Sequence, residues 1–271
     1  MGELRFPLRH HARTPAELVL QLGEFYLVGT SIAARATAFA LPRLGLAVDV
    51  GRLTPTLAAQ PTLLITHAHL DHTAGLLAYL NLRARANEAP CTVWVPAPIR
   101  GALVEALRHF PGMESVHKRM DLQEVIRPAQ EDLPFTLPDG TVVQAFAVEH
   151  GIPTLGWAVT PAGGKRPLVV FAADGDPRWF QQRPQLLEAQ VAVVECTYVG
   201  ENRRLAARLS LHAHLLDWVE LAPQLPCEVL VLAHLPEGPI PRRQWELLAQ
   251  VFPGTLVVWQ GPSSARRVAL P

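Results

Sequence analysis

Four side chains of metal-ligand type lie within six positions of the sequence. His67, His69, Asp71 and His72 occur in the segment ITHAHLDHTAG (65–75), directly after an apolar run of strand type. Alternation along a strand turns His67 and His69 to the same side, and the turn that follows brings the other two beside them. Neutral imidazoles and a carboxylate suit borderline divalent metals such as zinc. The segment therefore predicts a metal site, and the alternative is a hydrogen-bonded structural turn.

Four further polar residues occupy the same kind of position, the end of an apolar strand-like run. They are Asp49, His150, Asp174 and His234. Polar residues at the ends of buried strands build a shared cleft in layered α/β folds. Taken singly, each of them is typical of a turn; together with the histidine segment, they predict a shared site.

The elements that must position these residues fall into two groups. Strand-like runs (24–30, 36–41, 44–51, 62–66 and 91–96) dominate the first group, with helical patterns at 73–86 and 98–110. The second group has strand-like runs (141–151, 155–160, 167–174, 191–196, 228–234 and 255–260) and helical patterns that include 203–221 and 242–252. Two sets of strands, each accompanied by helices, predict an α/β fold of the αββα four-layer sandwich type. No linker interrupts the chain, so we expect a single domain over residues 1–271.

The composition narrows the classes of partner. The chain has 271 residues, of which 49% are hydrophobic, and its 24 basic and 24 acidic residues give a formal net charge of zero. Such a balance provides no overall field to attract nucleic acid, so a polyanion would need a local patch. The three cysteines form no CxxC, and no apolar run approaches the roughly 18–20 residues of a membrane span. We therefore expect a cytoplasmic protein without a membrane segment.

The order H-x-H-x-D-H, then His, then Asp, then His resembles the metallo-β-lactamase fold superfamily of metal-dependent hydrolases. The resemblance implies two divalent metal ions, with zinc preferred and manganese as the alternative. His67, His69 and His150 would hold one ion; Asp71, His72 and His234 would hold the second, and Asp174 would bridge them. Asp49 would support the histidine loop. Asp176 is the competing bridge, but its place before Pro177 is typical of a helix cap.

A narrower resemblance comes from VVECTY (193–198) followed by LHAHLLD (211–217). This pair resembles the Glu-plus-His element of ribonuclease Z, the tRNA 3′-processing endonuclease, in its short plant-type branch; segments 38–54 and 91–107 also match that branch. The resemblance implies that His212 is the general acid, oriented by Glu195, and that Asp71 both ligates metal and orients the nucleophile. His214 lies two positions further on, which on a helix faces elsewhere, so it is the weaker candidate.

Three departures from that family concern the substrate. The family's Gly/Pro-rich arm, which grips tRNA, is missing between His150 and Asp174, where the intervening residues suffice only for a hairpin. The family's phosphate-contacting HFSxRY reads HLPEGPIP, which places Glu237 where positive or hydroxyl groups would help, and the bacterial GEGTQ reads GRLTP (51–55). The metal chemistry therefore carries over better than the tRNA substrate does.

Three hypotheses of function follow. The first is a ribonuclease Z-type phosphodiesterase, in which metal-activated water attacks a phosphodiester of RNA, such as the tRNA 3′ trailer. The second is a small-molecule metallohydrolase on the same site, acting on a cyclic phosphodiester, lactone, thioester or sulfate ester. The third is a non-catalytic, metal-bound binding protein. A homodimer is implied by the resemblance alone.

Overall fold

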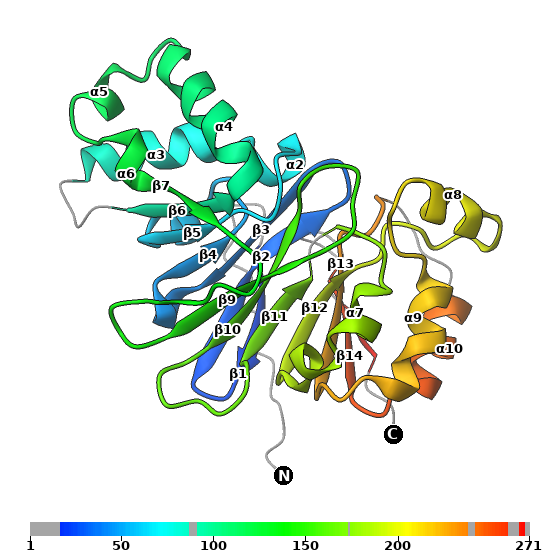
Figure 1. Cartoon of the computed structure of the whole chain (residues 1–271). Coiled ribbons are helices and arrows are strands. Elements are labelled where there is room, and N and C mark those ends of the chain that lie inside the picture. The colour runs from blue at the N-terminus through cyan, green and yellow to red at the C-terminus, as the bar shows by residue number, and fades with distance from the viewer. Residues whose placement is uncertain (1–16, 87–90, 173, 238–241, 260–265, 269–271) are drawn as a thin grey trace. The chain divides into compact units, whose positions relative to one another are not determined.

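The computed structural model describes residues 17–86, 91–172, 174–237, 242–259 and 266–268. The chain divides into two compact units, Met1–Gln130 and Glu131–Pro271. Each unit is built on one mixed β-sheet, and the strands of a sheet follow one another in chain order (Figure 1). The two sheets therefore carry the two groups of strands that the sequence predicts.

The first unit contains a seven-stranded sheet in the order β1 to β7. Strands β1 to β4 form an antiparallel meander, and β4 to β7 are parallel to one another. The strands are β1 (Leu18–Leu22), β2 (Phe25–Ile32), β3 (Ala36–Leu41), β4 (Leu46–Val48), β5 (Thr62–Leu64), β6 (Thr92–Pro96) and β7 (Ile126–Ala129). The helices are η1 (Pro42–Leu44), α1 (Pro55–Ala58), α2 (Leu70–Thr73), α3 (Leu76–Arg85), α4 (Ala97–His109), α5 (Glu114–His117) and α6 (Leu122–Val125).

Helices α3 to α6 cover one face of this sheet (Figure 1). Leu80 of α3 and Val104 of α4 pack in one buried cluster with Leu63 and Val93 of the parallel strands. Burying each such side chain contributes about 1.5–3 kcal/mol. Strands β4 and β5 are buried at every position, so polar side chains can be accommodated only where these strands end.

The second unit contains an eight-stranded sheet in the order β15 to β8. Strands β8 to β11 form an antiparallel meander, β11 to β14 are parallel, and β15 returns antiparallel. The strands are β8 (Phe135–Thr136), β9 (Val142–Ala147), β10 (Leu155–Thr160), β11 (Val169–Ala172), β12 (Val191–Glu195), β13 (Val229–Ala233), β14 (Thr255–Val258) and β15 (Arg266–Val268). The helices are α7 (Trp179–Gln182), η2 (Pro184–Glu188), η3 (Glu201–Arg203), α8 (Arg204–Leu209), α9 (Leu215–Leu221), η4 (Ala222–Gln224) and α10 (Arg242–Val251).

The helical layer of the second unit anchors the strand that ends at a candidate site residue. Trp218 of α9 is buried in the cluster that contains Val194 and Leu232. Its indole N–H donates to the backbone oxygen of Glu195 at 2.8 Å. This bond fixes the end of β12 against α9, and with it the start of the segment that leads away from the strand.

The helix that the sequence predicts over 203–221 is broken in the structure. Helix α8 ends at Leu209 and α9 begins at Leu215. Between them, Leu211 has a left-handed φ of 54°, which ends helical geometry. His214 caps α9, because its ring accepts the N–H of Leu216 while Asp217 accepts the N–H of His214. His212 therefore lies in a loop, and the expectation of one continuous helix is wrong.

The predicted hairpin between His150 and Asp174 is present. Strands β10 and β11 pair antiparallel, and residues 161–168 connect them without any longer insertion. Among the described residues, no helix is long and apolar enough to cross a membrane.

Candidate active site

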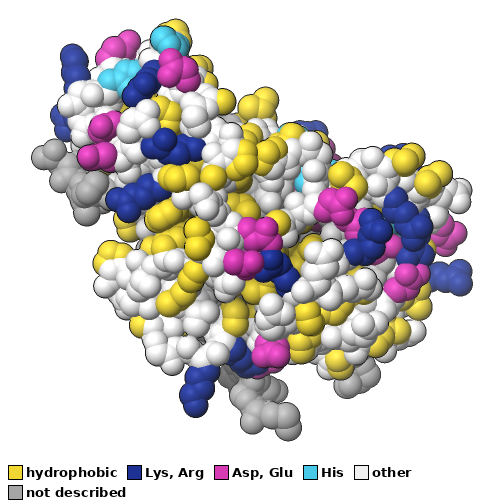
Figure 2. All heavy atoms as spheres, viewed as in Figure 1, with side chains coloured by type: hydrophobic (Ala, Val, Ile, Leu, Met, Phe, Trp, Pro, Cys, Tyr) yellow, Lys and Arg dark blue, Asp and Glu magenta, His cyan; other side chains and the backbone are white. Residues whose placement is uncertain are grey.

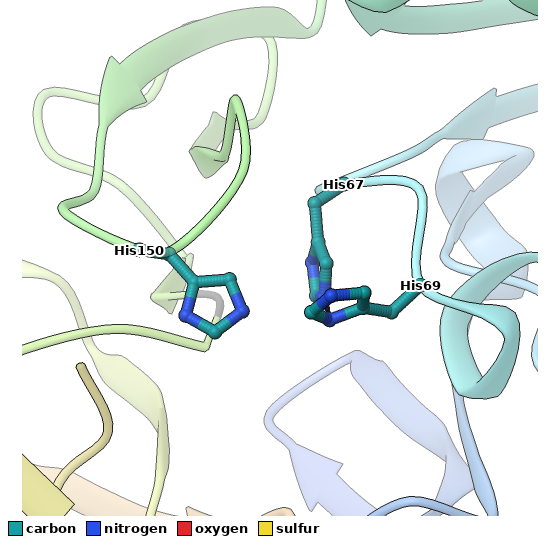
Figure 3. Close-up of side chains that lie close together, drawn as sticks. All are labelled: His67, His69 and His150. Atoms are coloured by element: carbon teal, nitrogen blue, oxygen red, sulfur yellow. Dashed lines mark hydrogen bonds between the residues drawn. The ribbon is translucent and has the colours of Figure 1, made fainter. Parts of the chain in front are cut away.

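The loop after β5 gathers the four side chains of the H-x-H-x-D-H motif. His67 Nε2 lies 3.1 Å from Nδ1 of His69, and Figure 3 shows their rings leaving the same loop and turning toward one another. His72 Nε2 lies 3.8 Å from Asp71 Oδ2. The rings of His67 and His72 have centroids 4.1 Å apart. The predicted convergence of these four residues within the first unit is therefore present.

A buried carboxylate, Asp49, and a buried hydroxyl, Thr66, contact the rings of His72 and His67. His72 Nδ1 donates to Asp49 Oδ2 at 2.7 Å, and Thr66 donates to the same carboxylate from its N–H and its hydroxyl. Thr66 Oγ1 lies 2.9 Å from His67 Nδ1. Burial raises the pKa of Asp49 above its ordinary value, and the bonds from His72 and Thr66 act in the opposite direction. Asp49 thus supports the histidine loop, as the resemblance implies.

Close backbone packing holds the loop that carries Asp71. Val50 N–H donates to the backbone oxygen of His72 at 2.8 Å. A Cβ on Gly51 would lie 1.7 Å from the backbone oxygen of Asp71. Only glycine at position 51 allows this approach, so the sequence of the loop after β4 determines where Asp71 is held.

The second unit gathers His150, Asp174 and His234 with the candidate acid His212. His150 Nδ1 lies 3.2 Å from the backbone oxygen of Leu211, and the rings of His150 and His212 have centroids 4.9 Å apart. His234 Nε2 lies 3.3 Å from Asp174 Oδ2. Ligand-type atoms of His150, Asp174 and His212 all fall within 4.8 Å of one another. The structure therefore brings these strand-end residues together within this unit.

Glu195 contacts His212 and not His214. Its side chain is buried, and Oε1 accepts from His212 Nδ1 at 3.0 Å and from the N–H of Ala213 at 2.6 Å. His214 is buried and caps α9, and its Nε2 lies 2.8 Å from the backbone oxygen of Gly200. Since a carboxylate can only accept, His212 Nδ1 is the donor in this pair.

The ligand-type nitrogen and oxygen atoms of the site residues in the two units suit divalent metal ions. His72, His150 and His234 each have an oxygen within hydrogen-bond distance of Nδ1, which orients the ring as metal-binding histidines are usually oriented. His234 Nε2 faces a carboxylate oxygen of Asp174, so two lone pairs converge where a shared cation would be stabilised. Imidazole nitrogens with carboxylate oxygens suit zinc and related metals.

The competing bridge candidate has a different partner. Asp176 accepts from Arg178 Nε at 2.8 Å and from Arg178 Nη2 at 2.6 Å, and it also accepts the Arg178 N–H. Burial acts to raise the pKa of Asp176, but the hydrogen bonds and charge of Arg178 outweigh it, so this pKa lies below its ordinary value. This geometry favours Asp174 over Asp176 for metal binding.

Two residues with central contacts, Thr66 and Thr197, were not singled out from the sequence. Each lies two positions after the end of a strand and contacts two histidine rings. Their position in the sequence was the signal that could have identified them. Thr66 directly precedes His67, and Thr197 lies between Glu195 and His212. Asp49, Leu211 and His234 also have left-handed φ angles of 57°, 54° and 51°. Such backbone strain is concentrated at functional sites in many proteins.

Arg204, the first residue of α8, is paired with two acids of α9. Arg204 Nε donates to Asp217 at 2.8 Å, and Arg204 Nη2 donates to Glu220 at 2.5 Å. In Figure 2, basic (dark blue) side chains over α8 and α9 lie close to acidic (magenta) ones. Glu237 is exposed, and the next residues of that segment, 238–241, lie outside the described residues. Arg204 is thereby committed to a structural contact between α8 and α9.

Comparison with known proteins identifies the family. Residues 46–235 match the family described as Beta-lactamase superfamily domain. A nuclear ribonuclease Z of Triticum aestivum is 34% identical over 143 residues, which cover 52% of this chain and 77% of the relative. The chloroplastic tRNase Z TRZ2 of Arabidopsis thaliana is 24% identical over 246 residues, which cover 79% of this chain and 68% of the relative.

Solved structures agree on the fold. The metallo-β-lactamase fold protein YhfI of Bacillus subtilis superposes with a TM-score of 0.66 at 16% identity, over 89% of this chain and 98% of that one. The short form of human tRNase Z superposes with a TM-score of 0.58 at 21% identity, over 77% and 91% of the two chains. The predicted α/β fold class is confirmed by these neighbours and by the two mixed sheets with their helices. The chain therefore belongs to the metallo-β-lactamase superfamily and, within it, to the ribonuclease Z family of metal-dependent hydrolases.

Proposed function

We propose that this hydrolase removes the 3′ trailer from tRNA precursors. The observation that carries the proposal is the buried Glu195 carboxylate, which accepts from Nδ1 of His212 at 3.0 Å. A phosphodiester with an alkoxide leaving group needs such a proton donor, whereas an ester with an acidic leaving group does not. The curated relatives named tRNase Z and ribonuclease Z support the same substrate class.

The ligand set is proposed on the motif order and the donor chemistry of each unit. His67, His69 and His150 would hold one ion, Asp71, His72 and His234 would hold the second, and Asp174 would be a ligand shared by both. Zinc is the preferred metal, since neutral imidazoles dominate the donors. When bound, such ions lower the pKa of a bound water and stabilise charge on the phosphoryl group.

The chain's own residues orient the reaction. Asp71 would be a metal ligand and would accept a hydrogen bond from the attacking water, which would fix the direction of attack. Glu195 fixes the ring of His212 and stabilises its positive charge before proton transfer. His212 then donates the Nε2 proton to the leaving oxygen.

We further propose that residues 1–271 act as one catalytic domain in the cytoplasm, as a homodimer. The family match runs from residue 46 to residue 235, across the boundary between the two compact units. Cys91, Cys196 and Cys227 are buried and free, which suits a reducing compartment.

A second candidate is a small phosphodiester substrate, which the short β10–β11 connection favours. Only residues 161–168 link these strands, and a segment of that length cannot form an arm that grips tRNA. The equal numbers of basic and acidic residues also give no net attraction for RNA.

A cleavage assay separates the two candidates. Purified protein loaded with zinc or manganese is incubated with a 3′-extended pre-tRNA and, separately, with bis-p-nitrophenyl phosphate. We expect cleavage of both, and loss of both in Asp71→Ala. Hydrolysis of the small diester with no cleavage of pre-tRNA would contradict the tRNA proposal and favour the second candidate.

A further inference from the structure

The hydroxyl of Thr197 lies between a buried carboxylate and the histidine proposed as a metal ligand. Thr197 donates to Glu195 Oε2 from both its N–H and its hydroxyl, each at 2.8 Å. The same Oγ1 lies 3.0 Å from His234 Nδ1 and 3.3 Å from His212 Nδ1. All four residues belong to the second unit, on or directly after β12 and β13 or in the loop before α9.

The number of available protons determines the direction of these bonds. Glu195 can only accept, so the single hydroxyl proton of Thr197 is donated to it. The lone pairs of Oγ1 then face His234, whose Nδ1 must carry the proton that joins them. With Nδ1 protonated, His234 presents an Nε2 lone pair toward Asp174 Oδ2, 3.3 Å away. Thr197 thus selects the tautomer that a metal requires.

The carboxylate of Glu195 is held firmly enough to orient two histidines. Five hydrogen bonds end on its carboxylate, from Gly175 N–H, His212 Nδ1, Ala213 N–H and the two donors of Thr197. One oxygen therefore orients His212 directly, while the other acts on His234 through the hydroxyl.

The first unit contains the same arrangement. Asp49 accepts directly from His72 Nδ1 at 2.7 Å, and it accepts the hydroxyl of Thr66 at 2.8 Å. Thr66 Oγ1 lies 2.9 Å from Nδ1 of His67. In both units a buried carboxylate contacts one histidine directly and a second histidine through a threonine.

We propose that Thr197 is a positioning residue that relays the charge of Glu195 to His234, so that one carboxylate orients both a metal ligand and the general acid. This inference rests on the proposed function, because it takes His234 as a ligand and His212 as the acid. The relay makes metal affinity depend on a hydroxyl group that does not itself touch the metal.

Two pairs of variants isolate the hydroxyl. Wild type and Thr197→Val differ by a hydroxyl replaced with a methyl, and Thr197→Ser and Thr197→Ala differ by the hydroxyl alone. Zn²⁺ affinity is measured by competition with a fluorescent chelator. We expect Thr197→Val and Thr197→Ala to bind about 10- to 100-fold more weakly than their hydroxyl-bearing partners, the usual effect of removing an outer-shell bond. If Thr197→Val does not fold, the Ser and Ala pair gives the same comparison.

A matched control has the same local bonds away from the site. Thr141 is buried and donates to Asp139 from its N–H and its hydroxyl, each at 2.9 Å. Thr141→Val should leave Zn²⁺ affinity unchanged. Equal affinities within both Thr197 pairs would overturn the relay, and so would a loss in Thr141→Val as large as that in Thr197→Val.

Turnover supplies a second readout. The Thr197 hydroxyl donates to Glu195, which orients His212, and it lies 3.3 Å from His212 Nδ1. At saturating Zn²⁺, Thr197→Val should therefore lower kcat more on a phosphodiester with an alkyl leaving group than on bis-p-nitrophenyl phosphate. An equal loss on both substrates would overturn the part of the proposal that concerns His212. Failure of the wild type to cleave pre-tRNA would overturn the proposed function only, since Zn²⁺ affinity tests the relay without RNA.

Discussion

At the scale of single residues, the candidate site is organised by which nitrogen of each histidine carries a proton. His72 donates from Nδ1 to Asp49, and His212 donates from Nδ1 to Glu195. In the proposed mechanism the same bond orientation would serve two purposes, because Nε2 would bind metal in His72 and would donate a proton in His212. The different roles therefore depend on what each Nε2 faces.

A substitution at Glu195 tests the role of His212. Glu195→Gln keeps the shape but replaces one accepting oxygen with an amide that donates, so His212 loses its negative partner. We expect kcat on pre-tRNA to fall by about 10²- to 10⁴-fold, the range of a general acid, and kcat on bis-p-nitrophenyl phosphate to fall much less. The p-nitrophenolate ion leaves without a proton, which explains the difference.

The control for this experiment is Glu188→Gln, an exposed position of the same unit. It should leave both kcat values near those of the wild type. Equal losses on the two substrates in Glu195→Gln would contradict an acid role for His212.

The residue types of the site were predictable, whereas the hydroxyl contacts were not. His67, Asp174 and His234 could be found because they interrupt apolar runs at the ends of buried strands, where an unpaired polar side chain would cost free energy. Thr66 and Thr197 could not, since threonine is common in strands and nothing in its type shows which groups its hydroxyl contacts. These contacts depend on residues up to 37 positions away, as for Thr197 and His234.

At the scale of elements, the residues of the candidate site lie at the ends of buried parallel strands. Strands β5, β12 and β13 are buried at every position, and Thr66, Glu195 and His234 lie at or just after their ends. The sequence pattern predicted these strands because the apolar runs are uninterrupted. It failed for the helix over 203–221, since the apolar periodicity continues through Leu211 although the chain turns there.

Gly51 tests how the loop after β4 positions the metal motif. A Cβ at this position would overlap the backbone oxygen of Asp71, so Gly51→Ala must displace the loop that carries Asp71. We expect Zn²⁺ affinity, measured by chelator competition, to fall at least tenfold, consistent with the sensitivity of metal sites to ligand placement.

Gly101→Ala is the matched control for that change. Gly101 lies within α4, and apart from its chain neighbours and the helix's own backbone, nothing lies within 4 Å of the Cβ position. This variant should raise the free energy of unfolding, measured by urea titration, by about 0.5–1 kcal/mol, because alanine favours a helix over glycine, and it should keep Zn²⁺ affinity. Unchanged affinity in Gly51→Ala would contradict the positioning role of the loop.

The contact between α8 and α9 predicts a pH dependence of stability. Hydrogen bonding from Arg204 holds the pKa of Glu220 below its ordinary value. A lowered folded-state pKa means that the stabilisation is present at neutral pH and is lost as pH falls through that value. Because Glu220 is exposed, Arg204→Met should cost below about 1 kcal/mol at pH 7. Urea unfolding at pH 7 and pH 4 should show a smaller difference from wild type at pH 4; a larger difference there would contradict the prediction.

At the scale of the whole molecule, the two units repeat one plan. Each begins with an antiparallel meander and continues into parallel strands, and each places a carboxylate–threonine–histidine network after those strands. Metal binding by the folded chain should therefore contribute to its stability as well as to its chemistry.

Metal removal tests this expectation. A ligand that binds only the folded state stabilises it by RT ln(1 + [L]/Kd), which is about 2.7 kcal/mol at a hundredfold excess over Kd. Protein treated with EDTA and dialysed should unfold at a lower temperature than the same protein with Zn²⁺, and the difference should grow with Zn²⁺ concentration. In Asp71→Ala most of the dependence should disappear because the proposed ligand set is broken, whereas Thr141→Val should retain it. A Tm independent of Zn²⁺ in the wild type would contradict metal binding by the folded chain and, with it, the proposed two-metal chemistry.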